Sequence, residues 1–172
     1  MTQFNDNLLL VVGKSSNGKS ASLMGLDNPE GVMYLNCESG KKLPFPAKFM
    51  KGRDGKPGLV ITDPLQVLEA FEAAETMPHI HTIVVDTLTY LLDMYESLYV
   101  LNAANTMKAW GDFAQYFKNL MQQYVAKSSK NVVFLAHTLE TMNESEMIME
   151  TKVPVKGSLK NNGINYFSPA VQ

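Results

Sequence analysis

The sequence predicts an α/β fold in which a mostly parallel sheet carries helices on both faces. Four short apolar runs alternate along the chain with segments of helical periodicity, which is the order that a parallel sheet requires. Three of these runs lead into polar residues, namely Glu38, Asp86 and His137. Ligands bind beyond the carboxyl ends of the strands in such sheets, so the same pattern predicts a functional site at that edge.

Composition limits the class of protein. The chain has 172 residues, is 45% hydrophobic and 19% charged, and has a formal net charge of −2. We therefore expect one globular domain over residues 1–172. No apolar run approaches the roughly 18 residues of a membrane span, and the first residues lack a signal-peptide pattern. The single Cys37 excludes an internal disulfide and favours a cytoplasmic location.

The first apolar run, 8–12, is followed by a glycine-rich segment and then by a helix expected at 21–26. The segment has the spacing G-x-x-x-x-G-K-[ST] of a phosphate-binding loop, or P-loop. Its residues and the one after it are Gly13, Lys14, Ser15, Ser16, Asn17, Gly18, Lys19, Ser20 and Ala21. A strand, a loop and a helix start in this order point backbone N–H groups at a triphosphate. Lys19 would then contact the β- and γ-phosphates of ATP, and the Ser20 hydroxyl would bind Mg²⁺.

The second apolar run, 32–36, precedes Glu38 and a segment without periodicity. This segment, 40–58, is predicted to be a basic loop insertion, because it holds six of the fifteen positive charges of the chain. Phe45 and Phe49 lie among these charges and are candidates for stacking on bases. A solvated loop is the alternative.

A short strand is expected at 59–61, followed by a helix that Asp63 caps. Pro64 would occupy its first position, and Gln66 stands where a capping box needs it. The apolar face of this helix is expected to comprise Leu65, Leu68, Phe71 and Ala74.

The third run, 81–86, ends at Asp86 and matches a Walker B strand, whose carboxylate orients Mg²⁺. A helix N-cap is the alternative role for Asp86. Many ATPases place a catalytic glutamate directly after this aspartate, but here Thr87 stands there. Glu38 is therefore the candidate for the base that activates water, with an N-cap or a solvated turn as its alternative.

A long helix is expected over 106–127, with an apolar face that includes Met107 and Trp110. The fourth run, 131–136, leads into His137. An acidic, methionine-rich segment follows at 140–150, and a hairpin or tail is expected at 151–172. Tyr90, Tyr95 and Tyr99 follow the Walker B strand and would either stack on bases or belong to the core.

In this order of elements the chain resembles the RecA-like ATPases, and most of all their phage-encoded core-only members. The resemblance rests on the P-loop at 13–20, Glu38, Asp86-Thr87 and His137-Thr138. It implies a three-layer core and hydrolysis of Mg-ATP, with Glu38 as catalytic base and His137 as sensor of the γ-phosphate. It also implies a role in single-strand annealing, recombination or repair, in the cytoplasm of a bacterial host if the chain is phage-encoded.

The resemblance further implies partners. RecA-like ATPases assemble into rings or filaments, in which a basic finger from one subunit completes the ATP site of its neighbour. Arg53 is the only arginine, so Lys156 and Lys160 are the preferred candidates for this finger, with a solvated hairpin as the alternative. Single-stranded DNA is the expected second partner, through the basic loop at 40–58, because the segment after His137 is acidic.

Two other functions remain open. A P-loop phosphotransferase surrounds the transferred phosphoryl group with several arginines, and a single arginine argues against this class. A nucleotide-dependent switch, whose output is a contact with another protein, would need no efficient base at Glu38.

Overall fold

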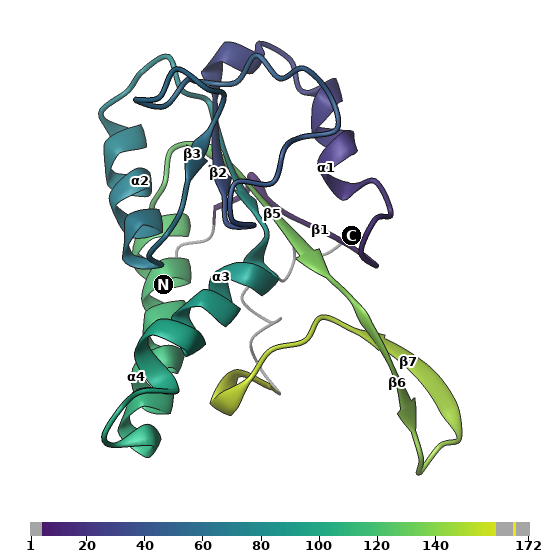
Figure 1. Cartoon of the computed structure of the whole chain (residues 1–172). Helices are drawn as coiled ribbons and strands as arrows, with labels where there is room; N and C mark the ends of the chain where they lie inside the picture. Colours follow the sequence, from purple (N-terminus) through teal and green to yellow (C-terminus); the bar gives the residue numbers. More distant parts are fainter. Residues whose placement is uncertain (1–4, 161–166, 168–172) are drawn as a thin grey trace.

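A parallel sheet of five strands lies at the centre of the computed structural model, which describes residues 5–160 and 167 (Figure 1). The strands are β1 (Leu8–Gly13), β2 (Val32–Asn36), β3 (Leu59–Val60), β4 (Thr82–Asp86) and β5 (Asn131–His137). They lie in the order β1-β5-β4-β2-β3, and every neighbouring pair is parallel. The predicted α/β fold is therefore confirmed.

The position of β5 in the sheet determines which residues meet at the carboxyl edge. β5 lies between β1 and β4, so the P-loop strand and the Walker B strand are not neighbours. Gly13 pairs with His137 across β1 and β5, and Asn36 pairs with Asp86 across β2 and β4. The four strands consequently end at one edge of the sheet, where β1 and β5 extend two residues beyond β4, because Asp86 pairs with Leu135.

Side chains alternate between the two faces of the sheet and form two apolar clusters. In β4, Ile83 and Val85 belong to one cluster and Val84 to the other. The first cluster is covered by α2 (Leu65–Glu75), α3 (Leu88–Tyr95) and α4 (Thr106–Asn119). The second is covered by Leu23 of the 3-10 turn η1 (Leu23–Gly25), which follows α1 (Lys19–Ser22), and by Phe49 and other apolar residues of the basic loop. The molecule thus has three layers (Figure 1).

The described chain also contains several short helical turns. They are the 3-10 turns η2 (Pro29–Gly31) and η5 (Gly157–Lys160), and the π-helical turns η3 (Glu96–Val100) and η4 (Leu120–Val125) that extend α3 and α4. No helix among residues 5–160 and 167 is long and apolar enough to cross a membrane.

α2 begins one residue later than predicted, at Leu65 with Pro64 as its N-cap, and its predicted buried face is right at Phe71 and Ala74 but wrong at Leu65. Asp63 Oδ1 accepts from the N–H of Leu65 and not of Gln66, and Gln66 Oε1 accepts from the N–H of Asp63, so only the second bond of the predicted capping box forms. Leu65 is 46% exposed. The buried residues of the helix are Val67, Ala70, Phe71 and Ala74.

In α4 the expected apolar face is wrong at Met107, which is 86% exposed. The buried residues of α4 include Ala109 and Phe113. Met107 precedes Ala109 by two residues, which places it about 200° around the helix from the buried face.

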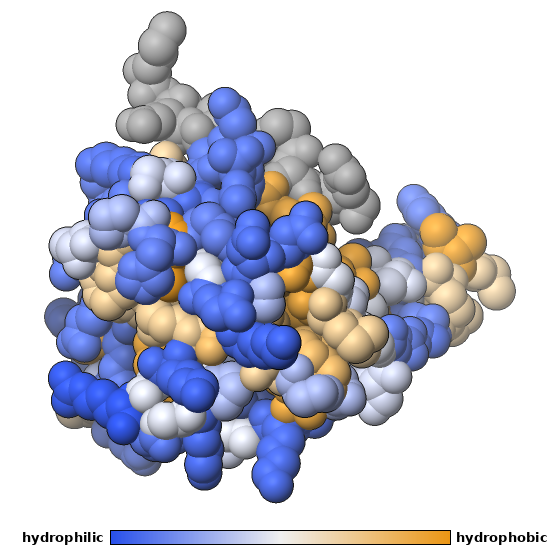
Figure 2. All heavy atoms as spheres, turned by 90° about the horizontal axis from the view of Figure 1, so that it is seen from above, coloured by the Kyte–Doolittle hydropathy of each residue, from blue (hydrophilic) through white to orange (hydrophobic). Residues whose placement is uncertain are grey.

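A two-stranded antiparallel hairpin follows β5 and projects from the body of the molecule (Figures 1 and 2). It consists of β6 (Leu139–Asn143) and β7 (Ile148–Lys152), so it lies ahead of the expected hairpin at 151–172. Of that expected segment, residues 161–166 and 168–172 lie outside the described chain. The exposed apolar side chains of the hairpin are Leu139, Met142, Met147, Ile148 and Met149.

Candidate functional site

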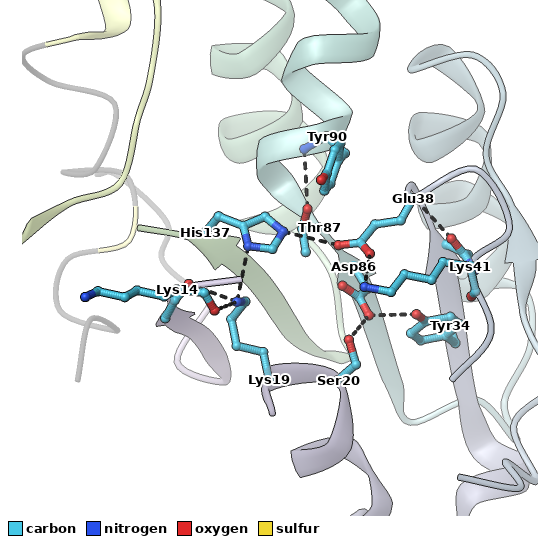
Figure 3. A network of polar contacts seen from close by, with 12 residues as sticks. Lys14, Lys19, Ser20, Tyr34, Glu38, Lys41, Asp86, Thr87, Tyr90 and His137 are labelled. Carbon is cyan, nitrogen blue, oxygen red and sulfur yellow. Dashed lines mark hydrogen bonds and ion pairs between the residues drawn. The ribbon is translucent and has the colours of Figure 1, made fainter. Parts of the chain in front are cut away.

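A cavity of about 240 Å³ opens at the carboxyl edge of the sheet, between the P-loop and the start of the basic loop. Five residues that the sequence singled out for catalysis or metal binding line it: Lys19, Ser20, Glu38, Asp86 and His137 (Figure 3). The P-loop residues Ser16, Gly18 and Ala21 also line it. The structure therefore brings together side chains from β2, β4, β5 and the P-loop.

The P-loop turns sharply before α1. Ser16 and Gly18 have positive φ angles of 65° and 80°, and the N–H of Asn17 donates to Lys14 O at 3.3 Å. The helix after the loop is shorter than expected, because α1 is a single turn that continues as the 3-10 turn η1. An anion at this loop would consequently be bound by Lys19 and the loop N–H groups more than by the dipole of a long helix.

Lys19 is held inside the site by three acceptors. Lys19 is only 8% exposed. Its Nζ donates to Gly13 O at 2.8 Å and to Lys14 O at 2.7 Å. The third acceptor is His137 Nδ1 at 3.3 Å (Figure 3). Burial lowers the pKa of Lys19, and the negative charges of Glu38 and Asp86 oppose this shift.

His137 connects Lys19 to Glu38. A lysine ammonium can only donate, so His137 Nδ1 must accept and the ring must carry its proton on Nε2. Nε2 lies 3.3 Å from Glu38 Oε1, to which it therefore donates. The backbone N–H of His137 donates to Thr89 Oγ1 at 2.9 Å, and the ring of Tyr90 packs edge-on at 5.4 Å between centroids. The imidazole is thereby fixed between the two charged groups.

A tight turn directs Glu38 into the cavity. Ser39 and Gly40 both have positive φ angles, of 54° and 77°, immediately after it. Asn36 Oδ1 accepts from the N–H of Glu38 at 3.0 Å and fixes the start of this turn. The Glu38 side chain is only 11% exposed, and its Oε2 lies 3.4 Å from Lys41 Nζ.

Asp86 is almost completely buried, and two hydroxyl groups donate to one of its oxygens. Ser20 Oγ and Tyr34 Oη lie 2.8 Å and 2.7 Å from Asp86 Oδ2. Asp86 Oδ1 is buried and has no hydrogen-bond partner among the residues that the structure describes. Burial raises the pKa of Asp86, and the hydrogen bonds from Tyr34 and Ser20 oppose that rise. The N-cap of α3 is Thr87 and not Asp86, because Thr87 Oγ1 accepts from the N–H of Tyr90.

These oxygens fit a magnesium ion. Mg²⁺ usually takes one or two protein oxygens and completes its shell with water and substrate phosphate. The unpartnered Asp86 Oδ1 and the adjacent Ser20 hydroxyl would supply such ligands. Within residues 5–160 and 167 no group of three or more His, Cys, Asp or Glu side chains is arranged to hold a metal by itself.

Sequence reasoning missed Tyr34. In the sequence, Tyr34 looks like one more apolar residue of a buried strand. Its partner Asp86 lies 52 positions away. No local pattern indicates such a contact.

Lys156, one of the expected basic finger residues, does not line the nucleotide cavity. Lys156 Nζ lies 2.5 Å from Glu96 Oε2 and 3.4 Å from Asp93 Oδ1 of its own chain. These contacts, above all the hydrogen bond to Glu96, raise the pKa of Lys156. Lys156 lines a second cavity, of about 400 Å³, that also reaches Ser15 and His137. The side chain of Lys160 lies outside the described part of the structure, and Arg53 is exposed in the basic loop.

The aromatic residues of the basic loop are placed differently from the prediction. Phe49 is 2% exposed and stacks on Tyr34, with 5.5 Å between ring centroids, so it cannot stack on a base. Phe45 is half-buried against Phe49. Tyr95 belongs to the core, whereas Tyr90 and Tyr99 are partly exposed.

Comparison with known proteins identifies the family. A family model described as an AAA domain matches residues 5–167, nearly the whole chain. No match was found among curated proteins. The chain therefore belongs to the AAA domain family, and it is a nucleotide-binding domain of the P-loop ATPase type.

Proposed function

We propose that the protein binds Mg-ATP in the cavity of about 240 Å³ and hydrolyses it, with Glu38 as the general base. The observation that carries this proposal is the chain of contacts from Lys19 through His137 to Glu38. These contacts bring a buried ammonium group and a carboxylate together at the carboxyl edge of the sheet, which supports a role for the first with the phosphates and for the second with water. Such a pair is what phosphoryl transfer to water needs.

The residues divide the reaction among them. Lys19 would exchange the carbonyls of Gly13 and Lys14 for the β- and γ-phosphate oxygens. Ser20 and Asp86 would hold Mg²⁺, which supplies positive charge to the triphosphate when it is bound. The oxygen of a water molecule attacks the γ-phosphorus, while the bond breaks between this phosphorus and the oxygen that bridges it to the β-phosphorus. Glu38 accepts the proton of that water.

His137 and Lys41 would control the base. The Nε2 proton of His137 fixes Glu38 Oε1, so that Oε2 is the oxygen that faces an incoming water. Lys41 contacts Oε2 at 3.4 Å and its side chain is 66% exposed, so water displaces it at small cost. The order of the polar strand ends supports a RecA-like branch of the family, in which His137 senses the γ-phosphate.

Glu38→Gln should lower the rate of ATP hydrolysis by about 100-fold or more, because it removes the proton acceptor and keeps the shape. Binding of a fluorescent ATP analogue should stay close to that of the parent. Lys19→Ala is the matched comparison, since it should lose both binding and hydrolysis. Steady-state turnover and fluorescence titration measure the two effects. Hydrolysis at the parental rate in Glu38→Gln would remove Glu38 from the mechanism.

We also propose that the active form is an oligomer in which Lys156 of one subunit completes the ATP site of another. The exposed apolar side chains of the projecting hairpin support such an assembly, because patches of this kind mark contact surfaces. Lys156 is held by two carboxylates in the isolated subunit, and in the assembly it would exchange them for the γ-phosphate of the neighbour.

ATP turnover per subunit should then rise with protein concentration, and Lys156→Ala/Lys160→Ala should be inactive alone. Mixing it with Lys19→Ala should restore partial turnover, since one of the two kinds of mixed interface combines an intact P-loop with an intact finger. Lys108→Ala, which changes an exposed lysine on α4 with one acidic partner, is the control and should behave like the parent. Turnover that is independent of concentration, or no recovery on mixing, would contradict the shared site.

The third part of the proposal concerns single-stranded DNA, in recombination, annealing or repair. The positively charged residues of the basic loop, all at least partly accessible to solvent, are Lys41, Lys42, Lys48, Lys51, Arg53 and Lys56. Loops from several subunits would form a continuous basic track, and each phosphate contact releases counterions. Because Phe49 is buried, this binding would depend on charge more than on stacking.

Replacement of Lys48, Lys51, Arg53 and Lys56 by Gln should weaken DNA binding and flatten its salt dependence. The slope of log K against log salt should fall by about 0.7 for each phosphate that the loop no longer neutralises. Lys41 and Lys42 stay unchanged, because they line the nucleotide cavity. A variant with Lys108, Lys118, Lys127 and Lys152 replaced by Gln makes the same change of net charge elsewhere and should bind like the parent. Fluorescence anisotropy with a non-hydrolysable ATP analogue measures both variants.

Equal binding by both quadruple variants would show that the loop is not the DNA site. If the parent binds no DNA in any nucleotide state, the second candidate function takes first place. That function is a nucleotide-dependent switch acting on another protein. It is favoured by the hairpin with its exposed methionines, which continues directly from the strand that ends at His137.

A further inference from the structure

Tyr34 is a buried tyrosine that places its hydroxyl group in the nucleotide cavity. It is 3% exposed, and its Oη donates to Asp86 Oδ2 at 2.7 Å. Ser20 Oγ donates to the same oxygen at 2.8 Å, whereas Asp86 Oδ1 has no hydrogen-bond partner in the described part of the chain. Two donors saturate one carboxylate oxygen, so the other oxygen is the one left to accept from a ligand. Figure 3 shows the two hydroxyl groups meeting at Asp86.

The two donors are not equivalent. Ser20 belongs to the P-loop, and its hydroxyl is itself a candidate ligand of the metal. Tyr34 comes from β2 and lies on the other side of the Asp86 carboxylate (Figure 3). When Ser20 turns to a metal ion, Tyr34 is the donor that still holds the orientation of Asp86. Partners of this kind, which hold a metal ligand without touching the metal, typically change metal affinity by about 10–100-fold when removed.

The ring of Tyr34 is held by the basic loop. It stacks on Phe49 with an interplanar angle of 26°. At the C-terminal end of the loop, a Cβ atom added to Gly58 would lie 2.7 Å from Cδ1 of Tyr34. The loop is tied to β2 near Phe49 and Gly58, because the N–H of Met50 donates to Val32 O and the N–H of Gly58 donates to Met50 O. A displacement of Phe49 or Gly58 would therefore press on the Tyr34 ring or release it.

We propose that Tyr34 is a positioning residue for the metal-binding carboxylate, and that it joins the basic loop to this carboxylate. The proposal rests on the magnesium site of the proposed function. It gives the basic loop a second role, since the position of the loop sets how well Asp86 is oriented toward Mg²⁺. A polyanion bound to the loop would act on metal binding by this route.

Tyr34→Phe tests the first half of the proposal, because it keeps the stacked ring and removes only the hydroxyl group. The Mg²⁺ concentration for half-maximal binding of a fluorescent ATP analogue should rise by about 10-fold or more. Binding of the same analogue in EDTA should not change. Electron paramagnetic resonance of Mn²⁺ gives a second measure of metal affinity that does not depend on turnover. Tyr116→Phe is the matched control, since the Tyr116 hydroxyl is also buried but donates to Pro64 O, away from the site.

Gly58→Ala tests the link between the basic loop and Tyr34, because the new methyl group pushes against the Tyr34 ring while the Tyr34 hydroxyl group remains. It should raise the Mg²⁺ requirement in the same direction as Tyr34→Phe. Gly55→Ala is its control: this glycine of the same loop also has a positive φ angle, 75° against 86°, but a Cβ atom there would meet nothing within 4 Å. Circular dichroism and urea unfolding establish that all variants are folded.

Asp86→Asn separates failure of this proposal from failure of the proposed function. If Asp86→Asn loses the effect of Mg²⁺ and Tyr34→Phe keeps the parental response, the metal site stands and Tyr34 has no positioning role. If Gly58→Ala and Gly55→Ala respond alike, the link to the basic loop is wrong. If Mg²⁺ does not affect nucleotide binding by the parent, the metal site fails and the role of Tyr34 fails with it.

Discussion

The buried ammonium group of Lys19 is the constraint on which the rest of the site depends. A charge removed from water needs strong partners, and Lys19 finds three acceptors in Gly13 O, Lys14 O and His137 Nδ1. These contacts close the P-loop on itself and fix the tautomer of His137. That tautomer in turn provides the proton that holds Glu38. One cation thereby organises the loop, the histidine and the candidate base before any nucleotide is bound.

The order of the strands makes this arrangement possible. β5 lies between β1 and β4, so His137 stands between the P-loop on one side and Asp86 on the other. β2 lies beyond β4; Tyr34 of this strand contacts Asp86, and Glu38 in the turn after it contacts His137. Asp86 and His137 are thus each connected to the segment that leads into the basic loop. In the proposed function this segment couples the bound nucleotide to the loop.

The sequence predicted the strands and the polar residues at their ends, because buried parallel strands leave continuous apolar runs and the P-loop spacing is specific. Helical faces were harder to predict. Met107 and Leu65 fit an apolar period, yet several offsets of that period are possible, and only packing on the sheet selects among them. The contact of Tyr34 with Asp86 and the burial of Phe49 depend on residues far apart in the chain. The hairpin was missed because its strands are exposed on both faces, so they lack the alternation of buried and exposed positions that marks a strand, although Asn143 and Ser145 form its turn.

A structure of the protein with Mg²⁺ and a non-hydrolysable ATP analogue tests the central claim most directly. We expect Lys19 Nζ to leave the carbonyl oxygens of Gly13 and Lys14 and to lie within hydrogen-bond distance of a γ-phosphate oxygen. Glu38 should face a water molecule next to that phosphate. The account is contradicted if the nucleotide lies outside this cavity, or if Lys19 keeps its three present acceptors while the nucleotide is bound.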